Sequence, residues 1–173
     1  MRGDQQKEVA TWFRSLAPVR PEEMIGLWRG AGIPSGHPLD GVLENLDWFG
    51  KRFHPDMRAD ALLFQERPGR LVPIEPVYIP IGLAIKFSSF GRTFVARNLF
   101  SHLQKMFRAR GTTASLRLQV DDGVKTAAMV YDRQPIVDYF RRVDRDEIAG
   151  MMCVQGDTRS YFFKLRRVNS QRD

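Results

Sequence analysis

Residues 26–32 read Gly-Leu-Trp-Arg-Gly-Ala-Gly, and they decide which fold we expect. Side chains two residues apart in a β-strand share a face, so Gly26, Trp28, Gly30 and Gly32 lie on one side. Glycine weakens a strand and is tolerated mainly where the strand bends sharply or another backbone comes close. The pattern predicts the opening strand of a tightly curved sheet, with the indole of Trp28 closing one end. The alternative is an ordinary core tryptophan among unrelated glycines.

The composition fits one globular domain, because 43% of the 173 residues are hydrophobic and 27% are charged. Residues 1–8 contain no apolar segment and no stretch approaches the ~18 apolar residues of a spanning helix, so we expect neither a signal peptide nor a membrane span. The single cysteine, Cys153, excludes an internal disulfide and is typical of a reducing compartment. The expected location is the cytoplasm.

The formal charge of +7 raises the question of an anionic partner. The basic residues are scattered, and only Lys105, Arg108 and Arg110 cluster, near Arg92 and Arg97 in the sequence. This distribution favours a solvated basic surface. A nucleic-acid or protein interaction module built on residues 105–110 is kept as an alternative.

Three ranges carry apolar residues at helical spacing, namely residues 4–16, 40–53 and 93–109. Asp40 is a suitable N-cap for the second range, and Lys51 and Arg52 in its last turn complement a helix dipole. We therefore expect an amphipathic helix at the N-terminus, a helix of about three turns across the mouth of the sheet, and a third helix later in the chain.

The remaining apolar runs predict strands. The short runs at residues 61–64, 71–74 and 77–81 are cut by prolines 73, 76 and 80, which confine them to edge, end or bulged strand positions. From Thr112 onward, alternating segments separated by turns predict an antiparallel meander over residues 112–168, with a hairpin turn at Asp121-Asp122-Gly123. Such strands leave exposed edges unless they close into a barrel.

Two parts of the chain resemble a known pair of sequence families. Residues 20–64, with Gly-Leu-Trp-Arg-Gly at 26–30, Gly-His-Pro-Leu-Asp-Gly at 36–41 and Trp-Phe-Gly-Lys-Arg-Phe at 48–53, resemble the bacterial GXWXG family. Residues 116–167 resemble the C-terminal domain of unknown function that usually accompanies it. This resemblance brings no assigned activity with it.

The glycine–tryptophan motif is also similar to that of the calycins, which include lipocalins, fatty-acid-binding proteins and nitrobindins. The resemblance implies a mainly β protein: one closed antiparallel calycin-like barrel over residues 1–173, with two or three short helices at its mouth and N-terminus. In calycins the tryptophan packs against an arginine of the last strand, which here is Arg166 or Arg167. Nitrobindins bind haem through a C-terminal histidine, and this chain has none after His102. We expect no haem, no other cofactor and no metal.

A small barrel either fills its interior with side chains or holds one small ligand. The residues that we predict to bind a ligand are Trp28, His37, Trp48, Lys51, Met129, Tyr131, Asp138, Phe140 and Arg142. Their alternative role is plain packing of the core. His37, Lys51 or Arg52 would meet a carboxylate at the mouth, although His37 also suits a hydrogen bond to the backbone of its own turn.

Asp138 is the sharpest of these candidates. It shares a strand face with Phe140 and Arg142, and a buried carboxylate must be paired or protonated. Arg142 is the expected partner, in a structural ion pair. A ligand-orienting or acid–base role is the alternative.

The first expectation for function is a cytoplasmic, lipid-binding type of protein that holds a small, largely apolar ligand, fatty-acid-like or another hydrophobic metabolite, inside the barrel. The chain carries no recognisable catalytic motif. The alternative is an isomerase or cyclase that uses Asp138, Tyr131 or His37 as acid–base groups. A monomer and a homodimer are both compatible with the sequence.

Overall fold

The computed structural model describes residues 2–67, 69–78, 86, 88–104 and 106–169. Its strands are β1 (Ala17–Pro18), β2 (Gly26–Ile33), β3 (Trp48–Phe53), β4 (Arg58–Arg67), β5 (Arg70–Pro73), β6 (Ala114–Asp121), β7 (Val124–Tyr131), β8 (Ile136–Arg142), β9 (Glu147–Val154) and β10 (Ser160–Arg167). Its helices are α1 (Arg2–Ser15), η1 (Pro21–Met24), α2 (Val42–Asn45), η2 (Pro76–Tyr78), α4 (Ser88–Gly91) and α5 (Phe94–Leu103).

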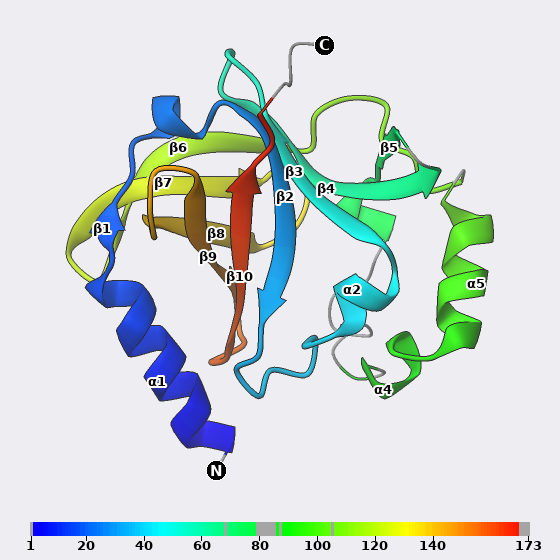
Figure 1. Ribbon diagram of the computed structural model, residues 1–173, viewed down its shortest axis with the longest axis horizontal. Helices are drawn as coiled ribbons and strands as arrows, with labels where there is room; N and C mark the ends of the chain where they lie inside the picture. The colour runs from blue at the N-terminus through cyan, green and yellow to red at the C-terminus, as the bar shows by residue number, and fades with distance from the viewer. Residues whose placement is uncertain (1, 68, 79–85, 87, 105, 170–173) are drawn as a thin grey trace.

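The strands of the described residues form one antiparallel sheet that returns to itself (Figure 1). Neighbouring strands follow the order β8-β7-β6-β4-β3-β2-β10-β9, and β9 pairs again with β8, so eight strands make a ring. β1 extends the sheet from β8, and β5 pairs with β4. The predicted class, mainly β and antiparallel with few helices, is confirmed.

The C-terminal meander is confirmed strand by strand from β6 to β10. Asp121 lies opposite Val124, which leaves a two-residue turn between β6 and β7. Both turn residues, Asp122 and Gly123, have positive φ angles of 49° and 77°. This geometry is typical of the tight hairpin turns that match the twist of paired strands.

The predicted helix over residues 40–53 is wrong. Only Val42–Asn45 is helical, Asp47 has a φ of 61°, and residues 48–53 form β3 between β2 and β4. At Gly50, with a φ of 149°, a Cβ atom would overlap the carbonyl oxygen of Trp28. Pairing along both edges of β3 therefore overrides the helical spacing of the apolar residues, and tertiary context often does so.

The third expected helix is confirmed only in its first part. α5 begins after Thr93, whose hydroxyl accepts a hydrogen bond from the Ala96 amide, and it ends at Leu103 rather than 109. Residues 107–109 instead form backbone hydrogen bonds with Pro73 and Glu75, next to β5. These bonds hold the segment beside the sheet. Lys105 lies outside the described residues.

Of the apolar runs cut by prolines, only β5 lies at an edge as expected, whereas residues 61–64 pair with β3 on one side, with bulges, and with β5 on the other. Residues 61–64 lie in β4, and residues 70–73 form β5, whose single strand partner in the described part of the sheet is β4. The last run begins with the short helix η2 at Pro76–Tyr78. Its remaining residues, 79–81, lie outside the described part of the chain.

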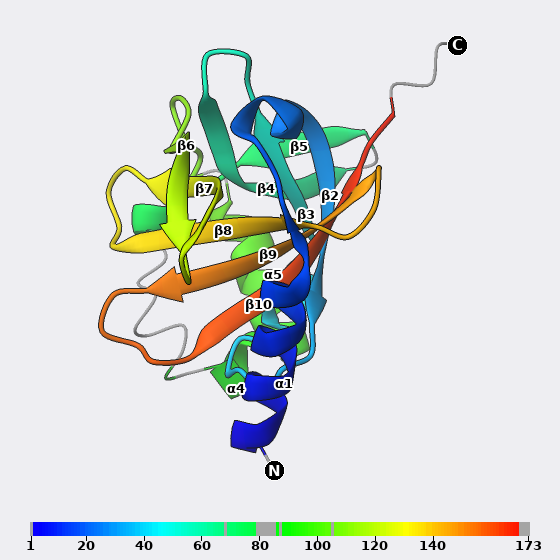
Figure 2. The same cartoon turned by 90° about the vertical axis from the view of Figure 1, so that its left-hand side faces the viewer.

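The N-terminal helix α1 packs on the outside of the ring, against β9 and β10 (Figure 2). Phe13 is fully buried there with Ala149, Met151 and Phe162. The opposite face of β9, which carries Ile148 and Met152, belongs to the main core inside the ring. The predicted amphipathic helix is confirmed, and it buries β9 on both faces.

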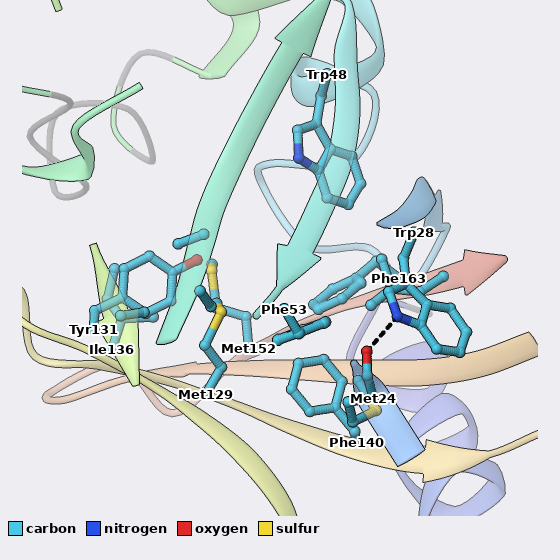
Figure 3. Packing of buried hydrophobic residues seen from close by; sticks show 14 of the residues in the cluster. Met24, Trp28, Trp48, Phe53, Met129, Tyr131, Ile136, Phe140, Met152 and Phe163 are labelled. Atoms are coloured by element: carbon cyan, nitrogen blue, oxygen red, sulfur yellow. Dashed lines mark hydrogen bonds between the residues drawn. The ribbon is translucent and has the colours of Figure 1, made fainter. Parts of the chain in front are cut away.

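Trp28, which Figure 3 shows beside Met24, closes one end of the ring together with Arg167. Trp28 and Arg167 are cross-strand partners on β2 and β10, and the Arg167 guanidinium lies 4.3 Å from the centre of the indole. Arg167 also donates hydrogen bonds to the carbonyls of Glu23 and Ile25, while the indole N–H donates to the carbonyl of Met24 at 2.6 Å. Arg166 points outward and pairs with Glu147, so alternation along β10 selects Arg167.

Replacing Gly50 by alanine should destabilise the protein by about 3 kcal/mol or more, because the new methyl meets backbone and the positive φ adds strain. Denaturant unfolding measures this loss. Gly111→Ala is the control, since a Cβ there has no neighbour within 4 Å and should change stability by less than about 0.5 kcal/mol. Equal stability of the two variants would contradict the close approach of β3 to β2.

Candidate functional site

The end of the ring opposite Trp28 holds an apolar cavity of about 100 Å³. Tyr131, Ile136 and Met152 line it from inside the ring, where Figure 3 shows their side chains gathered together. Val42 and Leu46, at the two ends of α2, line it from outside. The cavity therefore lies between the interior of the ring and a single turn of helix.

Successive side chains on the inward face of β8 mark three layers inside the ring. Ile136 lines the cavity, and Asp138 is fully buried two residues further on. Phe140 follows, packed edge-on against Phe53 and Phe163 with ring centres 5.6 and 6.3 Å apart. Asp138 thus lies between the apolar cavity and an aromatic layer that separates it from the Trp28 end.

Lys51, Asp138 and Tyr131 form a buried polar group that we call the Lys51 cluster. The Lys51 Nζ lies 2.9 Å from Asp138 Oδ2 and donates a hydrogen bond to the carbonyl of Ala61 at 2.9 Å. Tyr131 accepts from Lys51 and donates to Asp138 Oδ2, each at 3.4 Å. The rings of Trp48, Tyr131 and Phe163 surround Nζ at 5.1–5.8 Å.

The predicted ion pair between Asp138 and Arg142 is wrong. Four residues of strand span roughly 13 Å, so Arg142 lies at the sealed end of the ring and pairs with Glu23 at 2.7 Å. Lys51 takes its place because β3 is a strand whose bulged pairing with β4 directs this side chain inward. For the same reason Lys51 is not at the mouth, where the expected helix would have put it. Arg52 is partly exposed beside Asp60.

Burial dominates the protonation of this cluster. It raises the pKa of the Asp138 carboxyl, with Lys51 acting in the opposite direction, and it raises the pKa of Tyr131 well above its usual range. Asp138 Oδ1 is buried and has no hydrogen-bond partner among the residues that the structure describes. A buried oxygen of this kind is costly unless something donates to it.

His37 lies outside the cluster, in the turn that precedes α2. Its Nδ1 accepts a hydrogen bond from the Leu39 amide, and its ring packs on Tyr161 with centres 5.7 Å apart. Burial lowers the pKa of His37. These contacts match the expected backbone hydrogen bond in the turn.

The other predicted residues pack within the core. Met129 lies opposite Asp138 on β7, and Trp48 fills the space above Gly30, where a Cβ would overlap its indole. Trp28 lies at the sealed end, away from the cavity. The glycine spacing in β2 therefore leaves room for Trp48 as well as curving the strand.

The described basic residues near α5 do not form one helical face. Arg97 pairs with Asp47 at 3.0 Å, and Arg92 donates to the carbonyls of Pro38 and Asp40. Arg108 and Arg110 are exposed but follow the end of α5. The arginines on this side therefore mainly attach α4 and α5 to the loop around α2.

Lys51, Tyr131 and Asp138 were each expected at a ligand site, but their pairing with one another was not, and the helix expected across the mouth is only the single turn α2. If residues 48–53 are taken as a strand, Lys51 lies on the same face as Phe53. That alternation is the sequence signal for an inward-pointing Lys51. Leu43 and Leu46 also line the cavity, and Leu46 belongs to the helical spacing within residues 40–53.

Two family models match the chain, one described as GXWXG protein over residues 11–69 and one as Domain of unknown function (DUF4334) over residues 112–167. The chain is a GXWXG protein with a C-terminal domain of unknown function. In this GXWXG protein the two matched segments pair through β2–β10 and β4–β6. The first segment supplies Lys51 of the cluster, and the second supplies Tyr131 and Asp138.

A crystal structure of a protein from Thermomonospora curvata resembles this GXWXG protein with a TM-score of 0.66 and 27% sequence identity. The match covers 96% of this chain and 99% of the other. A comparison with curated proteins finds no match. Within the described residues, no helix combines the length and the apolar character needed to cross a membrane.

Removing either Lys51 or Asp138 alone should lower the free energy of unfolding much more than removing both. Lys51→Met and Asp138→Leu should each destabilise the protein by about 3–5 kcal/mol, because each leaves a buried charge without a partner. The double variant should be more stable than either single variant in denaturant unfolding. A double variant whose loss equals the sum of the two single losses would contradict the pairing.

His37 should make the protein sensitive to mild acid. Since burial lowers its folded pKa, the unfolded chain takes up a proton near pH 6.5 that the folded state resists, and stability falls as the pH drops from 7.5 toward 5. His37→Gln should flatten this part of the stability profile. His102→Gln, at the exposed end of α5, should retain the wild-type slope. Identical slopes in all three proteins would be evidence against a buried, neutral His37.

Proposed function

We propose that this protein binds a small, largely apolar ligand in the cavity between the ring and α2, and that the ring is a calycin-like barrel. The observation that carries the proposal is an apolar cavity that ends near a buried polar cluster, in a ring whose other end is closed by Trp28 and Arg167. Binding sites are commonly apolar with a few polar groups that fix orientation.

The size of the cavity limits the ligand. An engineered apolar cavity of about 150 Å³ holds benzene, so a cavity of about 100 Å³ accepts a single-ring compound such as toluene only with some outward shift of its wall. A second apolar groove of about 220 Å³ lies beside α4 and α5, and Val42 and Leu46 line both spaces. A longer, fatty-acid-like chain therefore requires the single turn α2 to move, which would join groove and cavity.

Catalysis is the second candidate, and the raised pKa of Asp138 favours it, because an isomerase or cyclase needs a poised proton acceptor. We place binding first because the polar hydrogens of Lys51 and Tyr131 already form hydrogen bonds within the protein. Neither is free to protonate a substrate. Conversion of a bound metabolite to a new product would reverse this order.

Filling the cavity should abolish binding. In NMR titrations, toluene should cause saturable shifts at residues around the cavity in the wild type, and Leu62→Trp, which places an indole on the cavity wall, should weaken binding at least tenfold. Leu118→Trp is the matched control, because Leu118 is exposed on β6 and does not line the cavity. A wild-type protein that shows no saturable shift with toluene would refute the proposed cavity function.

A further inference from the structure

The Lys51 cluster has a fixed supply of hydrogen-bond donors, and all of them are used. A lysine ammonium has three hydrogens, and Lys51 has three acceptors at hand: the Ala61 carbonyl, Asp138 Oδ2 and the Tyr131 hydroxyl. Tyr131 has one hydrogen and directs it to Asp138 Oδ2. Nothing in the cluster is left to donate to a ligand.

The acceptors of the cluster are not all used. Asp138 Oδ1 is fully buried and has no partner in the described part of the chain. The Tyr131 oxygen retains a lone pair after accepting from Lys51 and donating to Asp138. The cluster can therefore accept a hydrogen bond from a ligand but cannot give one.

Charge gives a second restriction. The Lys51 ammonium and the Asp138 carboxylate together carry no net charge. A carboxylate ligand would add an uncompensated negative charge to a fully buried site, and an ammonium would add a positive one. Both are costly in surroundings of low polarity. An uncharged ligand avoids this cost.

Asp138 is not itself in the wall of the cavity, but three of its neighbours are. Asp138 pairs with Met152 across β8 and β9 and follows Ile136 on the same inward face, and both of these neighbours line the cavity. Tyr131, which lines the cavity as well, contacts Asp138 directly. A polar group at the inner end of a bound molecule would thus meet the accepting side of the cluster.

We propose that the ligand is an uncharged apolar alcohol or phenol whose hydroxyl donates a hydrogen bond to Asp138 Oδ1. This inference rests on the proposed binding function, and it replaces the fatty acid expected from the sequence with a ligand of different chemistry. A carboxylate finds no free donor in the Lys51 cluster, and a hydrocarbon or ether donates nothing to Oδ1. The hydroxyl supplies the one interaction that the cluster lacks.

Four compounds of similar size test this inference: phenol, anisole, toluene and benzoate, titrated at pH 7 by calorimetry and NMR. Phenol should bind at least tenfold more tightly than anisole, because a hydrogen bond to a buried charged acceptor contributes on that scale. Benzoate should bind more weakly than toluene. Phenol no tighter than anisole, or benzoate the tightest of the four, would overturn the inference while toluene binding still supported the cavity. Failure of all four to bind would overturn the proposed function itself.

The apolar double variant Lys51→Met/Asp138→Leu provides the control for the cluster. It should still bind toluene, which shows that the cavity is intact, and its preference for phenol over anisole should fall to less than twofold. If this variant still prefers phenol over anisole, the hydroxyl binds somewhere other than Asp138, which would contradict the inference. If the variant does not fold, Asp138→Asn serves instead. The amide of this variant supplies new hydrogen-bond donors, so the affinities for benzoate and anisole should rise relative to that for phenol. An unchanged order of affinities would contradict the proposal.

Discussion

A Cβ atom at position 50 would overlap the carbonyl oxygen of Trp28, so the backbones of β2 and β3 can approach only if residue 50 is glycine. That approach holds residues 48–53 as a strand in the ring instead of a helix outside it. Once β3 is a strand with a bulged pairing to β4, Lys51 points to the interior and meets Asp138. The polar cluster, the layers around it and the position of the cavity all follow from this contact.

The two ends of the ring have different physical character. At one end, Arg167 covers the indole of Trp28 and donates to the carbonyls that lead into β2, so packing and hydrogen bonding are both satisfied there. At the other end, apolar side chains border a cavity under a helix of one turn. Polar groups are thus paired at the first end, whereas a helix of one turn borders the cavity at the second.

The Lys51 cluster lowers the stability of the fold. Its presence is therefore of interest for function. Burying an ion pair rarely improves on a well-packed apolar core, and here Asp138 Oδ1 also lacks a partner among the described residues. Because Lys51 comes from the GXWXG segment and Asp138 from the C-terminal segment, the pair also joins the two parts of the chain across the interior. A ligand hydroxyl would offset part of the cost by satisfying Asp138 Oδ1.

Local patterns in the sequence determined the strand at residues 26–32, the meander after Thr112, the amphipathic α1 and the burial of Asp138, because strand alternation and turn chemistry act over a few residues. The choice of Arg167 over Arg166 needed the register of β10 against β2, which a single strand does not contain. The tertiary structure alone decided that residues 48–53 form a strand and that Lys51, not Arg142, pairs with Asp138. Both depend on contacts between residues far apart in the sequence. At residues 48–53, pairing on two strand edges outweighed a helical spacing that looks the same as that of a true helix when only neighbouring residues are considered.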